Sequence, residues 1–124
     1  MPVTTIKLES DDLTIHDAWG KLTFEEAFIE IKIYYEHEKP TKNVLWDLTK
    51  VTELAFTAEE IEKNASFESR FDKKRSTGKT AIVAKKPFSF SFSRMFKLFS
   101  QMNPAPHDVM VFRNRNHAET WLKS

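Results

Sequence analysis

The sequence predicts a single α/β domain with a mostly parallel sheet, and three observations support this fold class. The chain has 124 residues, which is enough for one hydrophobic core and too few for two. Apolar residues alternate along the chain between short strand-like runs and longer stretches at helical spacing. The composition, 40% hydrophobic and 30% charged, is that of an ordinary folded protein. We expect one domain over residues 1–124, with a mixed, mostly parallel sheet of about five strands, an N-terminal β-hairpin and four helices, in the order β-β-α-β-α-β-α-β-α.

The first elements are a β-hairpin and a helix. Two β-prone runs, residues 4–8 and 13–19, are separated by a polar turn, which is the pattern of a hairpin. Gly20 is expected to end the second strand. Thr23 and Glu26 then have the spacing of a capping box, so a helix begins here. Its expected inward face repeats at helical spacing and comprises Phe24, Ala27, Phe28, Ile31 and Tyr35.

Three further strands alternate with helices. Residues 43–48, 80–84 and 108–112 are apolar runs bounded by polar residues, as in buried parallel strands. A second capping box at Thr57 and Glu60 begins the helix that follows the first of these runs. The expected inward residues of that helix are Ile61, Ala65, Phe67 and Phe71, and a short terminal helix carries Ala118, Trp121 and Leu122.

Residues 87–102 fit two periodicities. Phe88, Phe90 and Phe92 alternate as in a strand, but a longer apolar set repeats at helical spacing. A strand that began four residues after the previous one would leave no room for a parallel crossover, so we predict a helix. Phe92, Phe96 and Phe99 are expected in the core, whereas the opposite face carries Phe90, Arg94, Lys97, Leu98 and Gln101.

Composition and charge exclude several classes of protein. The absence of cysteine excludes disulfides, thiolate zinc sites and cysteine nucleophiles, and the sequence contains neither a signal-peptide pattern nor an apolar stretch of the ~20 residues that span a bilayer. We expect a cytoplasmic protein.

The net charge of +1 combines an acidic half, residues 1–62, with a basic half, residues 63–124. Such asymmetry indicates an anionic partner or head-to-tail association, unless the fold interleaves the two halves. Nucleic acid is not expected, because the chain is not rich in arginine.

The search for catalytic groups identifies few candidates. Gly78 to Thr80 resemble the end of a phosphate-binding loop, but Lys73 replaces the required glycine, and the segment precedes a strand instead of following one. The four histidines lack metal-ligand spacing, and we expect neither metal nor cofactor. Ser89, Ser91, Ser93 and Ser100 are interpreted as helix-start and surface hydroxyls. Asp47 closes a buried strand, where it could bind a ligand or hydrogen-bond the following turn.

Basic residues follow all three central strands of the predicted sheet. If these strands are parallel, five side chains gather at one edge of the sheet, beside the N-termini of helices: Lys50, Lys85, Lys86, Arg113 and Arg115. This edge would suit a phosphate, a carboxylate or an acidic partner. The alternative is three solvated loops that carry ordinary lysines. Beside it, Phe90 and Leu98 among cations would suit a lipid, an apolar ligand or a second subunit, unless the fold covers both faces of the helix.

Four segments together resemble the SpoIIAA-like branch of the STAS superfamily, a group linked by fold to CRAL-TRIO lipid-binding domains. They are Trp46-Asp47-Leu48-Thr49, the strand at residues 80–84, Ser93-Arg94-Met95-Phe96, and Val111-Phe112-Arg113 ahead of Ala118-Glu119-Thr120-Trp121-Leu122. The resemblance covers nearly the whole chain from about Leu13 and implies the fold more than the function. Anti-anti-sigma members carry a phosphorylatable serine at the start of the helix after the third strand. Here Ala55-Phe56-Thr57 takes that place, so we do not predict a sigma-factor regulator, although Thr57 supplies a hydroxyl.

The function expected from the resemblance and the residues together is a non-enzymatic STAS-like binding or regulatory domain. It would recognise a protein partner or a small apolar or anionic molecule. The alternative is a small enzyme with its active site around Asp47. A homodimer through the phenylalanine-rich helix and a peripheral membrane contact also remain open. The residues expected to bind are Asp47, Lys50, Phe56, Thr57, Lys85, Lys86, Phe90, Arg94, Arg113 and Arg115.

Overall fold

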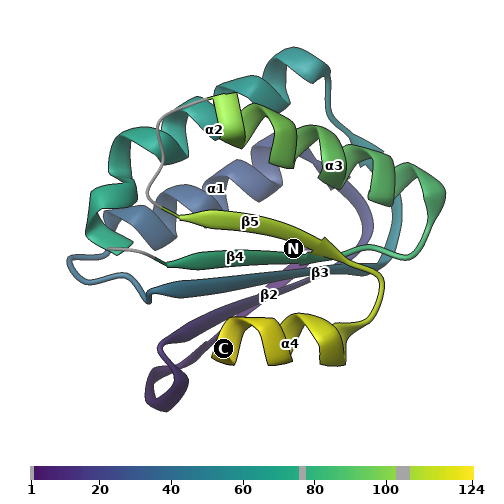
Figure 1. Cartoon of the computed structure of the whole chain (residues 1–124). Helices are drawn as coiled ribbons and strands as arrows, with labels where there is room; N and C mark the ends of the chain where they lie inside the picture. Colours follow the sequence, from purple (N-terminus) through teal and green to yellow (C-terminus); the bar gives the residue numbers. More distant parts are fainter. Residues whose placement is uncertain (1, 76–77, 103–106) are drawn as a thin grey trace.

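A computed structural model describes residues 2–75, 78–102 and 107–124 of the chain, and Figure 1 shows their arrangement. Five strands form one sheet in the order β1-β2-β3-β4-β5. β1 is antiparallel to β2, and every other neighbouring pair is parallel. The strands are β1 (Val3–Leu8), β2 (Leu13–Thr23), β3 (Asn43–Ala55), β4 (Lys79–Val83) and β5 (Asp108–Phe112). The helices are α1 (Phe24–Glu36), α2 (Ala58–Phe71), α3 (Pro87–Met102) and α4 (Arg115–Lys123), with short 3-10 turns η1 (Glu9–Asp11) and η2 (Asp72–Arg75).

The helices cover the two faces of the sheet unequally. α1, α2 and α3 lie on one face, and α4 alone lies on the other (Figure 1). This follows from the topology, because the three helical crossovers advance across the sheet in one direction and with one hand. The predicted fold class, element order and N-terminal hairpin are therefore confirmed. None of the described helices combines the length and apolar character needed to span a bilayer.

Three apolar clusters hold these layers together, and the smallest of them joins α1 to Val44 of β3. The two larger clusters lie on opposite faces of the sheet. Leu48, Val51 and Ile82 pack under the three-helix layer with Phe96. Leu45, Ala81 and Val83 point the other way and contact α4 through Ala118 and Leu122. β4 is therefore buried on both faces, which explains its continuous apolar sequence.

Both predicted capping boxes are present. At the start of α1 the Thr23 hydroxyl accepts a hydrogen bond from the Glu26 N–H at 3.2 Å, and the Glu26 carboxylate accepts one from the Thr23 N–H at 3.0 Å. Thr57 and Glu60 repeat the arrangement before α2, at 3.1 and 2.9 Å. These reciprocal bonds satisfy N–H groups that a helix start otherwise leaves unpaired.

Two predicted strand ends are wrong. β2 does not end at Gly20 but continues to Thr23, and β3 extends past residue 48 to Ala55. Gly20 adopts φ +66°, a conformation that glycine tolerates, and the pairing register shifts on both sides of it. The extension was not visible in the sequence because its outward positions are polar, so no apolar run marks it.

α3 is a helix as predicted, and its predicted inward face is confirmed: Phe96 is buried, and Phe92 and Phe99 pack half-buried against the same apolar cluster. Ser89 and Ser93 are fully buried and Ser100 is nearly so, which makes their interpretation as surface hydroxyls wrong. The Ser93 hydroxyl donates to the Ser89 carbonyl at 2.7 Å, so its polar group is satisfied within the helix. These small side chains share the inward side of α3 with the three phenylalanines, whereas Phe88, Met95, Leu98 and Met102 are exposed.

Candidate functional site

Asp47 lies within β3, where both of its carboxylate oxygens accept hydrogen bonds. One carboxylate oxygen accepts hydrogen bonds from the backbone N–H and the hydroxyl of Thr49, at 2.9 and 2.7 Å. The other accepts from the Arg115 guanidinium at 3.1 Å. The alternative in which Asp47 hydrogen-bonds the residues that follow it is therefore the one that the structure shows. A carboxylate used in this way holds the backbone in place and has little capacity left for catalysis.

Arg115 joins three elements by its charge. It is the first residue of α4, and its guanidinium also contacts Asp17 on β2 at 2.9 Å. Burial lowers the pKa of Arg115, but Asp17 and Asp47 outweigh this effect, so the net pKa is raised and the group stays charged. Arg115 thus fastens the start of α4 to the sheet through one nitrogen of its guanidinium.

The remaining basic candidates do not converge on one point. Lys50 lies inside β3 instead of following it, because the strand is longer than predicted, and it is exposed. The Lys86 ammonium donates to the Val51 carbonyl at 2.9 Å, which ties the start of α3 to β3. Lys85 and Arg113 are exposed, and no carboxylate of the described residues lies within ion-pair distance of either. Of the five basic residues, Lys86 and Arg115 therefore bond within the protein, whereas the other three are exposed.

Phe90, Arg94 and Arg113 form what we call the arginine–aromatic cluster. The Arg113 guanidinium lies 4.2 Å from the centre of the Phe90 ring, and that of Arg94 lies 6.0 Å away. Phe90 comes from α3 and Arg113 from the turn after β5, so two separate predictions meet at one place. In the part of the chain that is described, neither arginine has a carboxylate partner. Stacked guanidinium groups keep their edges free to bind carboxylates or phosphates.

The outer side of α3 continues this cluster with exposed apolar residues. Leu98 is 56% exposed and Met102 71%, and Phe88 and Met95 are exposed beside them. No aspartate or glutamate occurs in residues 73–107, so the helix and its flanks carry only positive charge. We call this combination the α3 surface: Phe88, Met95, Leu98 and Met102 together with the arginine–aromatic cluster. Leu98 belongs to the face that was predicted to lie opposite the core, and Phe88, Met95 and Met102 extend this exposed area.

Phe56 and Thr57, the other two predicted binding residues, are not part of the α3 surface. Thr57 caps α2 through its bonds with Glu60 and is exposed. Phe56 is half-buried between the rings of Phe92 and Phe24, with ring centres 4.9 and 5.8 Å apart, respectively. It therefore belongs to the packing between helices and sheet, where it also lines an interior cavity.

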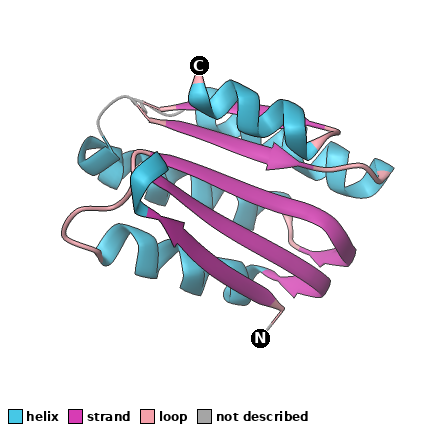
Figure 2. Cartoon of the chain, turned by 90° about the horizontal axis from the view of Figure 1, so that it is seen from below, coloured by secondary structure: helices cyan, strands magenta, loops and turns pink. Residues whose placement is uncertain are grey.

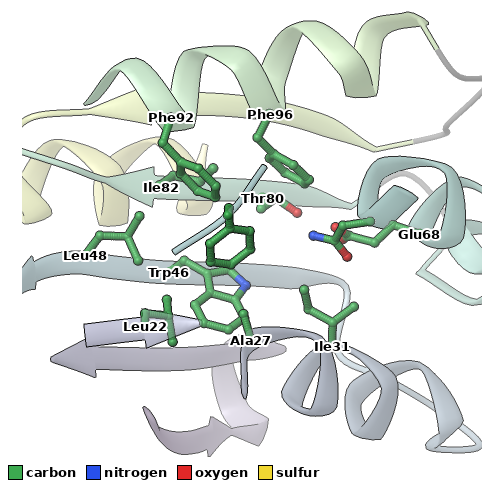
Figure 3. Close-up of a pocket in the computed structure, with 12 residues that line it drawn as sticks. Leu22, Ala27, Ile31, Trp46, Leu48, Glu68, Thr80, Ile82, Phe92 and Phe96 are labelled. Atoms are coloured by element: carbon green, nitrogen blue, oxygen red, sulfur yellow. The ribbon is translucent and has the colours of Figure 1, made fainter. Parts of the chain in front are cut away.

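This interior cavity lies between the three-helix layer and the sheet and has a volume of about 50 Å³. Figure 3 shows its mostly apolar walls, with Glu68 and Thr80 at one end. Asn64 also lines it, and its buried Oδ1 has no hydrogen-bond partner among the described residues. Asn64 and Glu68 were not predicted, because Phe67 and Phe71 were expected to face inward. Phe67 is half-buried, but the prediction for Phe71 is wrong, since it is exposed. Asn64 lies three residues after Ile61, and Glu68 three residues after Ala65, which puts all four on the buried face of α2.

Comparison with family models and with curated proteins finds no match. Two solved structures are similar over nearly the full length. An uncharacterised protein of the DUF3478 family with a SpoIIAA-like fold, from Shewanella loihica PV-4, shares 19% identity with a TM-score of 0.61, over 97% of this chain and 91% of that chain. An anti-sigma factor antagonist from Mycobacterium paratuberculosis shares 17% identity with a TM-score of 0.63, over 98% and 95%. The chain has a SpoIIAA-like fold. At these identities the likeness concerns the fold, and the resemblance in the sequence is confirmed at that level.

Proposed function

We propose that this protein is a non-catalytic regulatory domain, active in the cytoplasm, that binds an acidic segment of a partner protein through the α3 surface. The observation that carries the proposal is the arginine–aromatic cluster. Arg94 and Arg113 flank Phe90 without a carboxylate partner in the described chain, next to exposed apolar side chains. Arginine and aromatic residues are enriched among those that dominate binding energy at protein interfaces.

The chemistry of the α3 surface supports an acidic and partly apolar partner. Its cations would pair with aspartate, glutamate or a phosphorylated side chain, and the guanidinium forks suit bidentate contacts. Leu98 and Met102 would bury apolar side chains of the same segment. One structural neighbour is an anti-sigma factor antagonist, a description that implies action on another protein. The engagement of Asp47 by Thr49 and Arg115 argues against the alternative of an enzyme centred on that carboxylate.

A site-specific photo-crosslinker at position 98 tests this proposal in a lysate of the organism that encodes the chain. We expect it to capture one protein through an acidic segment, identified by sequencing the crosslinked peptide. Arg113→Glu and Arg94→Glu should each reduce the yield at least about tenfold, because they place like charges opposite the segment. The matched control is the same crosslinker at Phe71, an exposed apolar position on α2 that lies outside the α3 surface.

Three outcomes would contradict the proposal. Equal capture from both positions would indicate nonspecific contact, and a crosslinked segment without acidic residues would remove the role of the arginines. In the third, the protein binds phosphatidylglycerol vesicles, loses this binding in Arg113→Glu, and captures no protein. That result would assign the α3 surface to an anionic membrane instead.

A second candidate function is the binding of an apolar molecule of only a few non-hydrogen atoms in the interior cavity, whose volume is about 50 Å³. The observation that favours it is the buried Asn64 Oδ1, an acceptor that an apolar ligand with one N–H or O–H group would satisfy. Native mass spectrometry of the purified protein, followed by extraction, tests it. A bound molecule that disappears in Asn64→Leu supports this candidate. Retention of the molecule in Asn64→Leu, or a protein that carries nothing, contradicts it.

A further inference from the structure

We propose that two copies of this chain associate through their β1 edges, so that one continuous sheet runs through both. This surface is separate from the α3 surface, at the opposite end of the strand order. β1 ends that order, and no other described strand lies beside its outer edge, as Figure 2 shows from below. An open strand edge presents a row of backbone donors and acceptors whose natural complement is another strand.

The backbone pattern shows which residues of β1 would bond to a second copy. The Trp19 N–H donates to the Pro2 carbonyl at 2.9 Å, and Val3 lies opposite Ala18. Because hydrogen-bonded and non-bonded pairs alternate in an antiparallel ladder, the even-numbered residues of β1 direct their backbone groups toward β2. The groups of Val3, Thr5 and Lys7 therefore point outward, free to form a second ladder.

Apolar side chains flank this edge on both faces of the sheet. Ile6, which is 46% exposed, and Leu8 lie on the same face of the sheet as α4, in the part that α4 does not cover. On the other face, α1 packs against β1 and β2 and exposes Ile29 and Ile33, the latter by 59%. Natural edge strands are normally protected by charges, proline or a covering element, and Lys7 is the one charged residue within β1.

The geometry of the fold suits a two-fold axis at this edge. Strands are spaced about 4.8 Å apart, so helices centred between β1 and β2 of each copy would lie ~10 Å apart across the axis. Helices pack at 8–10 Å, so α1 of the two copies would meet antiparallel through Ile29 and Ile33. The same symmetry operation thus completes the ladder and covers the exposed isoleucines.

Charge complementarity selects the register. If the axis passes through Ile6, Lys7 of one copy lies opposite Thr5 of the other. The Thr5 hydroxyl already donates to the Glu30 carboxylate at 2.8 Å, so Lys7 would meet Glu30 of the second copy, twice by symmetry. Ile6 would then face Ile6 as a non-hydrogen-bonded pair, in which Cα atoms are about 4.5 Å apart.

Single cysteines test this arrangement cleanly, because the chain contains none. Under mild oxidation Ile6→Cys should form a disulfide-linked dimer, because its Cα separation lies within the range that disulfides allow. Leu8→Cys is the matched control on the same strand and face. In this register its two copies would be ~13 Å apart, too far for a disulfide, so this variant should stay uncrosslinked.

Sedimentation of the unmodified chain provides the second measurement. We expect a dimer that dissociates in Ile33→Glu and in Lys7→Glu, that re-forms when Lys7→Glu is combined with Glu30→Lys, and that persists in Leu98→Glu. Circular dichroism confirms that each variant is folded. A monomeric wild-type chain, a dimer lost only in Leu98→Glu, or equal crosslinking of Ile6→Cys and Leu8→Cys would overturn the proposal.

Discussion

Arg75 and Arg113 lie at opposite ends of the central strands, and their surroundings differ in almost every respect. Arg75, in η2, is 1% exposed and donates to the carbonyls of Lys42 and Lys79, at distances from 2.8 to 3.2 Å. It also bonds the hydroxyls of Thr80 and Tyr35. Arg113 is exposed, has no ion-pair partner in the described chain, and rests on the ring of Phe90.

This difference separates a structural cation from a binding one. A buried guanidinium must use its donors within the protein, because an unpaired charge in the interior is very unfavourable. Arg75 does so and thereby joins the amino ends of β3 and β4. An exposed guanidinium on an aromatic ring keeps its donors for another molecule. The number of internal hydrogen bonds that an arginine makes therefore indicates its role better than its position along the strands.

Arg75→Met should produce the largest loss of stability. The substitution leaves the part-buried Lys42 and Lys79 carbonyls and the buried Thr80 hydroxyl without their donor, and each such loss costs about 1–3 kcal/mol. Urea denaturation followed by circular dichroism measures the change in the free energy of unfolding. Arg70→Met, at an exposed position on α2, is the control and should change it by less than about 0.5 kcal/mol. Equal losses in the two variants would remove the distinction between buried and exposed arginines.

His16 extends the comparison to a buried group that is uncharged. It stacks on Trp46 with ring centres 4.2 Å apart, and its Nδ1 lies 2.8 Å from the Thr5 hydroxyl. Since that hydroxyl donates to Glu30, the histidine Nδ1–H is the donor to Thr5. Burial lowers the pKa of His16 from 6.5 to about 3. The unfolded chain therefore binds a proton between these pH values that the folded chain does not.

The expected result is a loss of stability as the pH falls. The contribution of His16 decreases by roughly 1.4 kcal/mol for each pH unit below 6.5, down to the folded pKa, and is constant above 6.5. The check is urea denaturation at pH 7.0, 6.0 and 5.0 for the wild type and for His16→Gln, whose profile should be flatter. His37→Gln, at an exposed position, should keep the wild-type slope. Parallel profiles for wild type and His16→Gln would show that folding leaves the pKa of His16 unchanged.

Local patterns predicted much of the fold, because the interactions behind them involve neighbouring residues. The capping box of Thr23 and Glu26 and the helix at residues 87–102 could both be identified in this way. The extension of β3 to Ala55 could not, since its stability comes from pairing with β2 and not from its own apolar residues. The inward serines of α3 were missed because hydroxyls that bond their own helix can face a core.

Two residues of the candidate site were predicted from the sequence, each from a different pattern. Arg113 was identified as a basic residue after a strand, and Phe90 as an aromatic residue on the outer face of a helix. Only the packing of α3 beside β5 brings them together. Arg115 was grouped with Arg113 by sequence, but its contacts with Asp17 and Asp47 give it a structural role. Distant pairing of this kind leaves no signal in a single sequence.

Arg113→Ala should produce the smallest change in stability and therefore gives the sharpest contrast with Arg75. An exposed cation–π contact contributes about 0.5–1 kcal/mol, so the free energy of unfolding should fall by no more than this. The same variant should strongly reduce capture of the proposed partner, because the guanidinium edge is lost. Arg113→Lys keeps the charge but not the planar fork, and it should restore only part of the binding. If Arg113→Ala instead destabilised the fold as much as Arg75→Met, its guanidinium would be a structural group, and the α3 surface would lose the cation on which its proposed function depends.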